Sequence, residues 1–249
     1  MSQEKTDLKF IWGNAGIENI EKKIFSIGTE IYFNSYITDD SINALIKEFN
    51  NVISSQKKFE MRLYTGDEEI PINITLFITS YGGHLDATFR FVDYINNLKK
   101  TGRLNELTTV MTGHCASAST IIAQLGDYRY MTHYCIVLIH ELSSSNFGNY
   151  TKMDSYMKML RKLHRDIVNI FVSKSNLTEE EIRTLFLKET WLSSNQYLKK
   201  GLIDGIYGED QPVQNIESEK IQNVDETINS KRKNSNNNNN NTISKRQRV

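Results

Sequence analysis

The sequence predicts an α/β domain in which strands alternate with helices. Three apolar runs rich in β-branched residues predict strands at residues 72–78, 106–112 and 134–139, and the first of them is typical of a strand buried on both faces. A glycine turn and then a helical pattern of apolar residues follow each of the first two runs. Because polar and small residues gather where these strands end, we expect a functional site at the carboxyl ends of the strands.

The chain before the first long strand predicts a short strand and a helix. Residues 31–33 are apolar and predict a short strand. A polar segment at residues 38–41 then supplies an N-cap for a helix. Apolar residues recur at helical spacing over residues 42–52. Residues 54–71 are polar and end in a proline, so we expect a surface excursion there.

Helices follow the later strands at regular intervals. Helical patterns cover residues 89–98, 117–125 and 151–172, the last being a long amphipathic helix whose apolar stripe contains methionines. Thr178 and Glu181 have the spacing of a capping box, which predicts a further helix start. A short helix then ends at Gly201, where we expect the last strand to begin.

Apolar residues are concentrated in the middle of the chain, which indicates a single folded domain. We assign residues 26–207 to this domain and residues 1–25 to an N-terminal extension of unclear role. Residues 208–249 are rich in Asn, Ser, Lys and Glu and include an unbroken Asn run at 236–241. Such a composition buries too little apolar surface to offset the entropy of ordering, so we expect a disordered tail.

Charge and cysteine content favour a soluble protein of a reducing compartment. The formal net charge is +0, which argues against a surface that binds nucleic acid or membrane as a whole. Two cysteines without a CxxC spacing provide neither a disulfide framework nor a zinc motif. With no secretory leader and no apolar run of membrane-spanning length, we expect a cytoplasmic protein, and the basic end of the tail leaves nuclear targeting open.

Ser117 has two possible roles. It follows a strand, Gly113 and a small-residue segment, and an apolar helical stretch begins directly after it. At a helix start a serine hydroxyl commonly serves as the N-cap. It could instead be a nucleophile, which would need a base, an orienting acid and an oxyanion site from other parts of the chain.

Four motifs together resemble the ClpP family of self-compartmentalising serine peptidases. They are ITSYGG at 78–83, GHCASAS at 113–119, IHE at 139–141 and ETWLSSNQYLKKGLID at 189–204, in the family's order and at similar spacings. The resemblance covers about residues 26–207. It implies the fold that ClpP shares with crotonases, built from repeated β-β-α units with a long protruding handle helix, here the one that begins near Thr151.

The resemblance also implies roles for five residues. By position in the motifs, Ser117 is the nucleophile and His140 is the general base. The amides of Gly83 and Ala118 correspond to the family's oxyanion hole, and a glycine and a helix start are suited to that role. Glu189 stands where the family usually has the Asp of the triad, and it would orient the base with a longer side chain.

Two further departures from the family pattern concern the surroundings of the site. Tyr81 replaces the usual proline before the glycine pair, which changes the rigidity of the loop without removing an amide. Residues 58–71 have the look of an insertion. The insertion and the unusual N-terminus depart from the family pattern, and they affect what the resemblance implies about its axial and ATPase-docking surfaces.

Other reactive residues have simpler explanations. Cys115 occupies a position of small packing residues and is typical of a buried, inert thiol. His84, His114 and His133 form no HExxH pair or other recognised metal spacing, so we expect neither a metal nor a cofactor. The chain also has no GxxxxGK[ST] motif and cannot itself be a P-loop ATPase.

The first functional hypothesis is therefore a serine endopeptidase that cleaves peptide or protein substrates. The resemblance implies a homo-oligomer of stacked rings, with the sites facing a chamber and a separate AAA+ unfoldase as a possible partner. The second hypothesis is a catalytically weak or inactive structural subunit of a mixed ring, for which the Glu189 replacement is the only support. A third is an acyl-CoA enzyme of the crotonase fold, which would not need a Ser-His pair at these positions.

Overall fold

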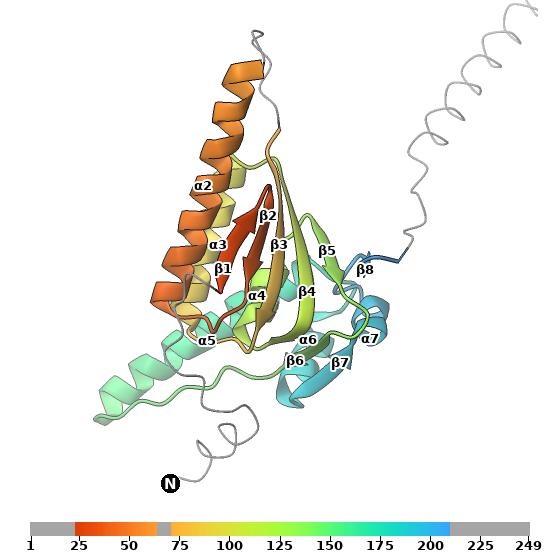
Figure 1. Cartoon of the computed structure of the whole chain (residues 1–249). Coiled ribbons are helices and arrows are strands. Elements are labelled where there is room, and N and C mark those ends of the chain that lie inside the picture. The colour runs from red at the N-terminus through yellow and green to blue at the C-terminus, as the bar shows by residue number, and fades with distance from the viewer. Residues whose placement is uncertain (1–22, 64–70, 210–249) are drawn as a thin grey trace, which may run out of the picture. The chain divides into compact units, whose positions relative to one another are not determined.

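A computed structural model describes residues 23–63 and 71–209, which contain one mixed sheet with helices packed against it (Figure 1). The strands are β1 (Ile24–Ile27), β2 (Glu30–Phe33), β3 (Asn73–Ser80), β4 (Glu106–Ala116), β5 (Tyr128–Met131), β6 (Ile136–Ile139), β7 (Thr190–Ser193) and β8 (Gly205–Ile206). The helices are α2 (Asp39–Leu63), α3 (Leu85–Lys100), α4 (Ala118–Ala123), α5 (Tyr150–Ser173), α6 (Glu179–Leu187) and α7 (Ser194–Lys199). The α/β class predicted from the sequence is confirmed.

The sheet is parallel at its centre. Its main path runs β1-β2-β3-β4-β5-β8, and the pairs from β2 to β8 along this path are all parallel, whereas β1 is antiparallel to β2. Strand β3 has buried residues on both of its faces, including three consecutive ones at residues 76–78, as expected for a strand that is covered on both sides.

Strand β4 changes its neighbour halfway along its length. It lies beside β3 throughout, but on its other side it pairs with β5 over residues 108–111 and with β6 over residues 114–116. Gly113, with φ +59°, lies between the two pairings and allows the strand to change course without ending. In open parallel sheets, ligands bind where neighbouring chain paths diverge, and α4 begins directly beyond this point.

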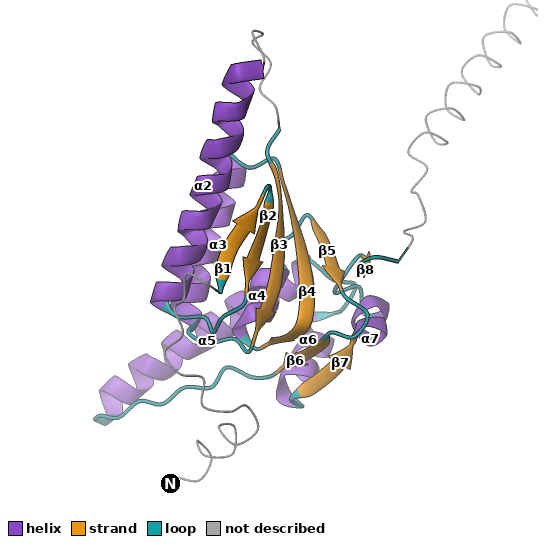
Figure 2. Ribbon diagram, in the orientation of Figure 1, coloured by secondary structure: helices purple, strands orange, loops and turns teal. Residues whose placement is uncertain are grey.

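The helices cover the sheet in two groups. Figures 1 and 2 show α2 and α3 side by side along one flank, where α2 also contacts β1 and β2. Helix α4 packs against β4 and α3 and also contacts α5, which in turn contacts α6. The core between these layers is continuous, and its largest completely buried side chains include Phe33, Phe49, Phe91, Phe171 and Tyr197.

Several elements differ from the sequence expectation. Residues 54–63, expected as part of a surface excursion, continue helix α2, because they are rich in good helix formers although they are too polar to continue its apolar stripe. Strand β4 does not end at Gly113 but continues to Ala116. Strands β1, β5 and β7 were not predicted, since each has only four residues and shows little apolar periodicity.

Other expectations agree with the structure. Helix α6 begins after Thr178 with the predicted capping box, in which Thr178 and Glu181 bond each other's backbone amides. Helix α7 ends just before Gly201, which has φ +66°. The expected Asn-rich tail after Glu209 and most of the N-terminal extension lie outside the described residues. Among the residues that are described, no helix has the length and apolar character needed to span a membrane.

Candidate active site

Ser117 lies in a strained turn between β4 and α4. Its φ is +56° and its ψ is −129°, a backbone conformation that residues other than glycine rarely adopt. Although it occupies the N-cap position of α4, its hydroxyl makes no capping hydrogen bond. The N-cap interpretation of Ser117 is therefore wrong, and the strained turn presents a hydroxyl that the helix does not use.

The turn is held from both sides by hydrogen bonds. The Ser117 amide donates to the Leu138 carbonyl at 2.9 Å, which continues the β4–β6 ladder into the turn. The Thr120 hydroxyl donates to the Ser117 carbonyl at 2.6 Å. The Ser119 hydroxyl is buried and lies 2.7 Å from the Ala116 carbonyl and 3.0 Å from the Ser80 carbonyl of β3. These contacts keep Ser117 in its unusual conformation.

Gly82 packs directly against this turn. A Cβ atom at Gly82 would lie 2.6 Å from the Ala116 carbonyl oxygen, 2.7 Å from the Ser117 Cβ and 3.0 Å from the Ala118 amide nitrogen. The φ of Gly82 is +88°, which also favours glycine. The first glycine of the Gly82-Gly83 pair is thus needed so that β3 can approach the serine turn.

Gly83 and Ala118 both present backbone amides at this point. Ile37 donates to the Gly82 carbonyl and accepts from the His84 amide, as in a parallel bridge opposite Gly83. In this pattern the N–H of Gly83 itself points away from Ile37. Ala118 is the first residue of α4, so its amide has no partner within the helix. The structure therefore offers two N–H donors beside Ser117.

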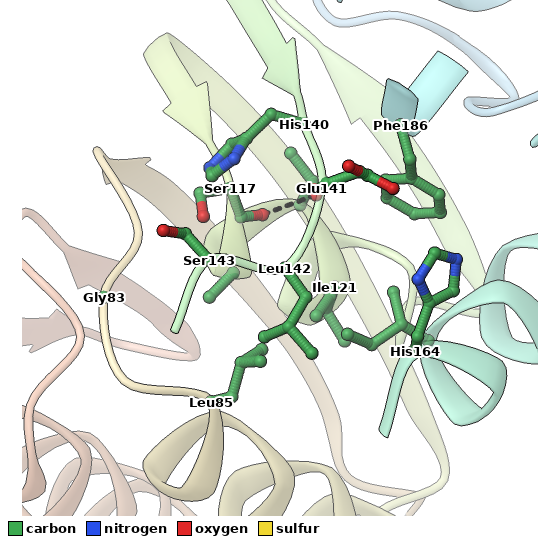
Figure 3. Close-up of a pocket in the computed structure, with 13 residues that line it drawn as sticks. Gly83, Leu85, Ser117, Ile121, His140, Glu141, Leu142, Ser143, His164 and Phe186 are labelled. Carbon is green, nitrogen blue, oxygen red and sulfur yellow. Dashed lines mark hydrogen bonds between the residues drawn. The ribbon is translucent and has the colours of Figure 1, made fainter. Parts of the chain in front are cut away.

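Ser117, Ala118, Gly83 and His140 line one pocket of about 220 Å³ (Figure 3). His140 follows β6, the strand that pairs with the end of β4, and Figure 3 shows its ring directed toward Ser117. The rest of the lining is contributed by Leu85, Thr120, Ile121, Glu141, Leu142, Ser143, His164, Ile167 and Phe186. Four of the five residues predicted from the motifs are thus brought together.

Glu189 is positioned less directly. Strand β7 is antiparallel to β6 with Thr190 opposite Ile139, so the next step of the same register sets Glu189 opposite His140. Its side chain is exposed, and it is not among the residues that line the pocket. Within the described residues, the structure has no hydrogen bond from His140 to Ser117 or to Glu189. Like Ser117, Glu189 has a positive φ, of +45°.

Tyr81, which replaces the family's usual proline, takes part in an aromatic stack. Its ring lies 3.5 Å from the ring of His114 and 5.7 Å from that of Tyr36. Burial lowers the pKa of His114, so the neutral ring is favoured in this stack. Stacking is thus available to fix the loop that precedes the glycine pair.

Cys115 is unsuited to be the nucleophile. It is completely buried, and burial raises the pKa of its thiol to about 12. Its sulfur lies 3.3 Å from the Ser119 hydroxyl rather than in the pocket. Over the described part of the chain, no group of three or more His, Cys, Asp or Glu side chains is arranged to hold a metal ion.

Sequence reasoning missed the pocket wall that α5 and α6 contribute. His164 and Ile167 come from α5 and are far in sequence from every motif, whereas Phe186 of α6 lies just before the motif at 189–204 but outside it. A partial signal was present, since Ile167 belongs to the predicted apolar stripe and a residue three positions earlier shares its face. Nothing in the sequence indicated that this face would border Ser117 rather than only the core.

Comparisons with known proteins agree with the motifs. The family model for Clp protease matches residues 31–210. ATP-dependent Clp protease proteolytic subunit 1 of Chlamydia trachomatis serovar D is 25% identical over 191 residues, covering 75% of this chain and 90% of that protein. The ATP-dependent Clp protease proteolytic subunit of Leuconostoc citreum is 30% identical over 137 residues, covering 53% and 66% respectively. The fold, the arrangement around Ser117 and the family match establish that this chain belongs to the Clp protease family.

Proposed function

We propose that this chain is a serine endopeptidase in which Ser117 is the nucleophile. The observation that carries the proposal is the strained turn at Ser117. The hydroxyl of this serine makes no capping hydrogen bond, and Ser117 lines a pocket together with His140. Strained backbone that its surroundings hold in place is characteristic of functional sites. Membership of the Clp protease family, which implies peptidase activity, supports the same reaction.

In the proposed mechanism, the oxygen of Ser117 attacks the scissile carbonyl carbon while His140 accepts the hydroxyl proton. The carbonyl oxygen becomes an oxyanion and is stabilised by the amides of Gly83 and Ala118. Collapse of this tetrahedral intermediate breaks the carbon–nitrogen bond, and His140 donates its proton to the leaving amine. Water then hydrolyses the acyl-enzyme, with His140 acting first as base and then returning the proton to Ser117.

Glu189 is the proposed third member of the triad. Its position opposite His140 in the β6–β7 register supports this role. Its exposure means that the carboxylate must turn toward the imidazole, and catalytic hydrogen bonds commonly tighten only when substrate is bound. Once turned, the carboxylate would fix the tautomer of His140 and stabilise the imidazolium.

A fluorophosphonate probe tests the nucleophile directly. The full-length chain should form one covalent adduct, and Ser117→Ala should abolish it. Ser143→Ala is the matched control, because Ser143 is another serine of the same pocket and should not affect labelling. Absence of an adduct in the wild-type chain, or labelling that survives Ser117→Ala, would contradict the proposal.

We further propose that the chain assembles into stacked rings and receives folded substrates from a separate AAA+ ATPase. The relatives are named as proteolytic subunits of ATP-dependent Clp proteases, and this chain has no P-loop motif. Helix α5 and the segment before it expose Phe147, Tyr150 and Met157, as expected for a contact surface. Analytical ultracentrifugation should detect a large assembly, and Met157→Glu should reduce it to smaller species.

An inactive subunit of a mixed ring is the alternative. The exposed carboxylate of Glu189 favours it, because a triad without a working acid is greatly weakened. The discriminating result would be a Ser117→Ala variant that leaves both ring assembly and peptide turnover of a mixed complex unchanged.

A further inference from the structure

The pocket beside Ser117 has an apolar middle and a polar far end. Its apolar side chains are Leu85, Ile121, Leu142, Ile167 and Phe186. Figure 3 shows the Glu141 carboxylate and the His164 imidazole on the Phe186 side of the pocket, away from the hydroxyl of Ser117. A side chain that enters next to the scissile carbonyl would pass the apolar residues first and reach these two polar groups with its tip.

His164 has hydrogen-bonding capacity that the described residues do not use. Its Nε2 atom is buried and has no hydrogen-bond partner among them. The ring lies against Phe186, with centroids 6.0 Å apart and an interplanar angle of 69°. An unsatisfied buried polar group is costly and uncommon in native proteins, so a turn of the ring toward a ligand in the pocket would give Nε2 the partner that it lacks.

The hydrogen-bonding groups of Glu141 and His164 indicate which substrate side chain fits the pocket. A carboxylate such as that of Glu141 accepts hydrogen bonds, whereas a neutral imidazole donates or accepts according to its tautomer. A carboxamide has both N–H donors and a carbonyl acceptor, so it complements either tautomer of His164 and the Glu141 carboxylate as well. Glutamine carries this group on an aliphatic stem that suits the apolar middle of the pocket.

We infer that His164, assisted by Glu141, is a specificity-determining residue that favours glutamine immediately before the scissile bond. This inference rests on the proposed peptidase function of the same site. It predicts a preference set by the far wall of the pocket, which α5 and α6 build, rather than by the catalytic residues themselves.

The test uses two fluorogenic peptides that are identical except for glutamine or methionine before the scissile bond. Methionine has a similar length but no N–H donor. For the full-length chain, we expect His164→Leu to lower the glutamine-to-methionine ratio of kcat/KM about tenfold, because one hydrogen bond in the pocket is lost. Glu141→Ala should lower the ratio less, by about threefold, because this carboxylate is exposed to competing water.

Two variants separate specificity from a structural effect. His164→Gln keeps a hydrogen-bonding side chain and should preserve most of the ratio, whereas His133→Leu makes the same change at a largely exposed histidine outside the pocket and should preserve all of it. A ratio unchanged in His164→Leu, while Ser117-dependent turnover persists, would overturn this inference alone. No Ser117-dependent turnover of either peptide would overturn the proposed function with it.

Discussion

Ser117 and Glu189 are the two non-glycine residues with positive φ in the described part of the chain, but their surroundings differ. The serine turn is bounded by Gly82, by the Leu138 carbonyl and by buried residues of α4. Glu189 is exposed, and its amide has a long contact of 3.4 Å with the Phe186 carbonyl at the end of α6. The nucleophile is held by packing from several elements, whereas the proposed acid is held mainly by its own segment.

This difference indicates how the two parts of a triad can be built in one fold. A nucleophile must be aligned before the substrate arrives, since small displacements of reacting groups greatly reduce the rate. An acid acts through the imidazole and can complete its hydrogen bond on substrate binding. A strained backbone at both positions, with dense packing at only one of them, fits a site whose acid side is adjustable.

The largest expected effect comes from Glu189→Gln, which tests whether the exposed segment belongs to the site at all. The amide keeps the size of the side chain but lets His140 adopt the wrong tautomer, so kcat should fall by about 10⁴-fold. Steady-state peptide hydrolysis measures the change. Glu180→Gln is the matched control, because it neutralises an exposed carboxylate of α6 in the same part of the chain.

If Glu189→Gln and Glu180→Gln have the same small effect, Glu189 is not the triad acid. The comparison between the two strained residues would then contrast a catalytic turn with an ordinary helix end.

Gly82→Ala tests whether close packing around the Ser117 turn is needed for activity. The new Cβ would overlap the Ala116 carbonyl and the Ser117 Cβ, at distances of 2.6 and 2.7 Å, and would displace the turn. We expect kcat/KM to fall by about 100-fold or more, because the hydroxyl and the Ala118 amide lose their alignment. Peptide hydrolysis gives the rate, and circular dichroism on heating shows whether the variant is folded.

Gly102→Ala provides the control for the backbone cost of this change. Gly102 has φ +67°, but apart from its neighbours in the chain no atom of the described residues lies within 4 Å of the position that its Cβ would take. It should therefore lose some thermal stability and keep its activity. Equal activity losses in the two variants would show that general destabilisation, rather than displacement of the turn, explains the effect of Gly82→Ala.

The same contrast explains what could be predicted from the sequence. The turn at Ser117 could be predicted because strand, glycines and small residues are adjacent in the chain, and their packing needs leave a local pattern. The contribution of His164 and Phe186 could not, because it depends on how α5 packs on α4 and how α6 packs on α5. Residues 54–63 were not predicted as helix because periodicity detects a buried helix face, and residues 54–59 of α2 are largely exposed.

The pH dependence of stability that arises from the Cys115 thiol tests the packing beneath the Ser117 turn, and it needs no measurement of activity. Burial raises the pKa of its thiol from about 9 to about 12, so the protonated form favours the folded state. Its contribution to stability is complete below pH 9 and is lost as the pH rises from 9 to 12, because the unfolded chain ionises first. Above pH 9, the wild-type chain should lose up to about 1.4 kcal/mol per pH unit more than Cys115→Ala does.

Urea unfolding at several pH values between 8 and 11 measures this difference. Titration of the other groups is common to both proteins and cancels in the comparison. Cys135→Ala should reduce the slope in the same direction, because burial also raises the pKa of that thiol. Parallel curves for all three proteins would mean that water reaches Cys115 and that the packing beneath Ser117 is looser than the structure indicates.

The smallest effect is expected from relieving the strain at Glu189, where glycine should be better tolerated than alanine. With φ at +45°, alanine keeps a steric cost of about 1–2 kcal/mol that glycine avoids, and this outweighs the greater chain entropy that glycine loses on folding. Glu189→Gly should therefore be more stable than Glu189→Ala by roughly 0.5–1 kcal/mol in urea unfolding. At Glu180, inside α6, the order should reverse by about 1 kcal/mol. If alanine is the more stable residue at both positions, the strain at Glu189 is relaxed in solution, and Ser117 alone carries the stored strain of the site.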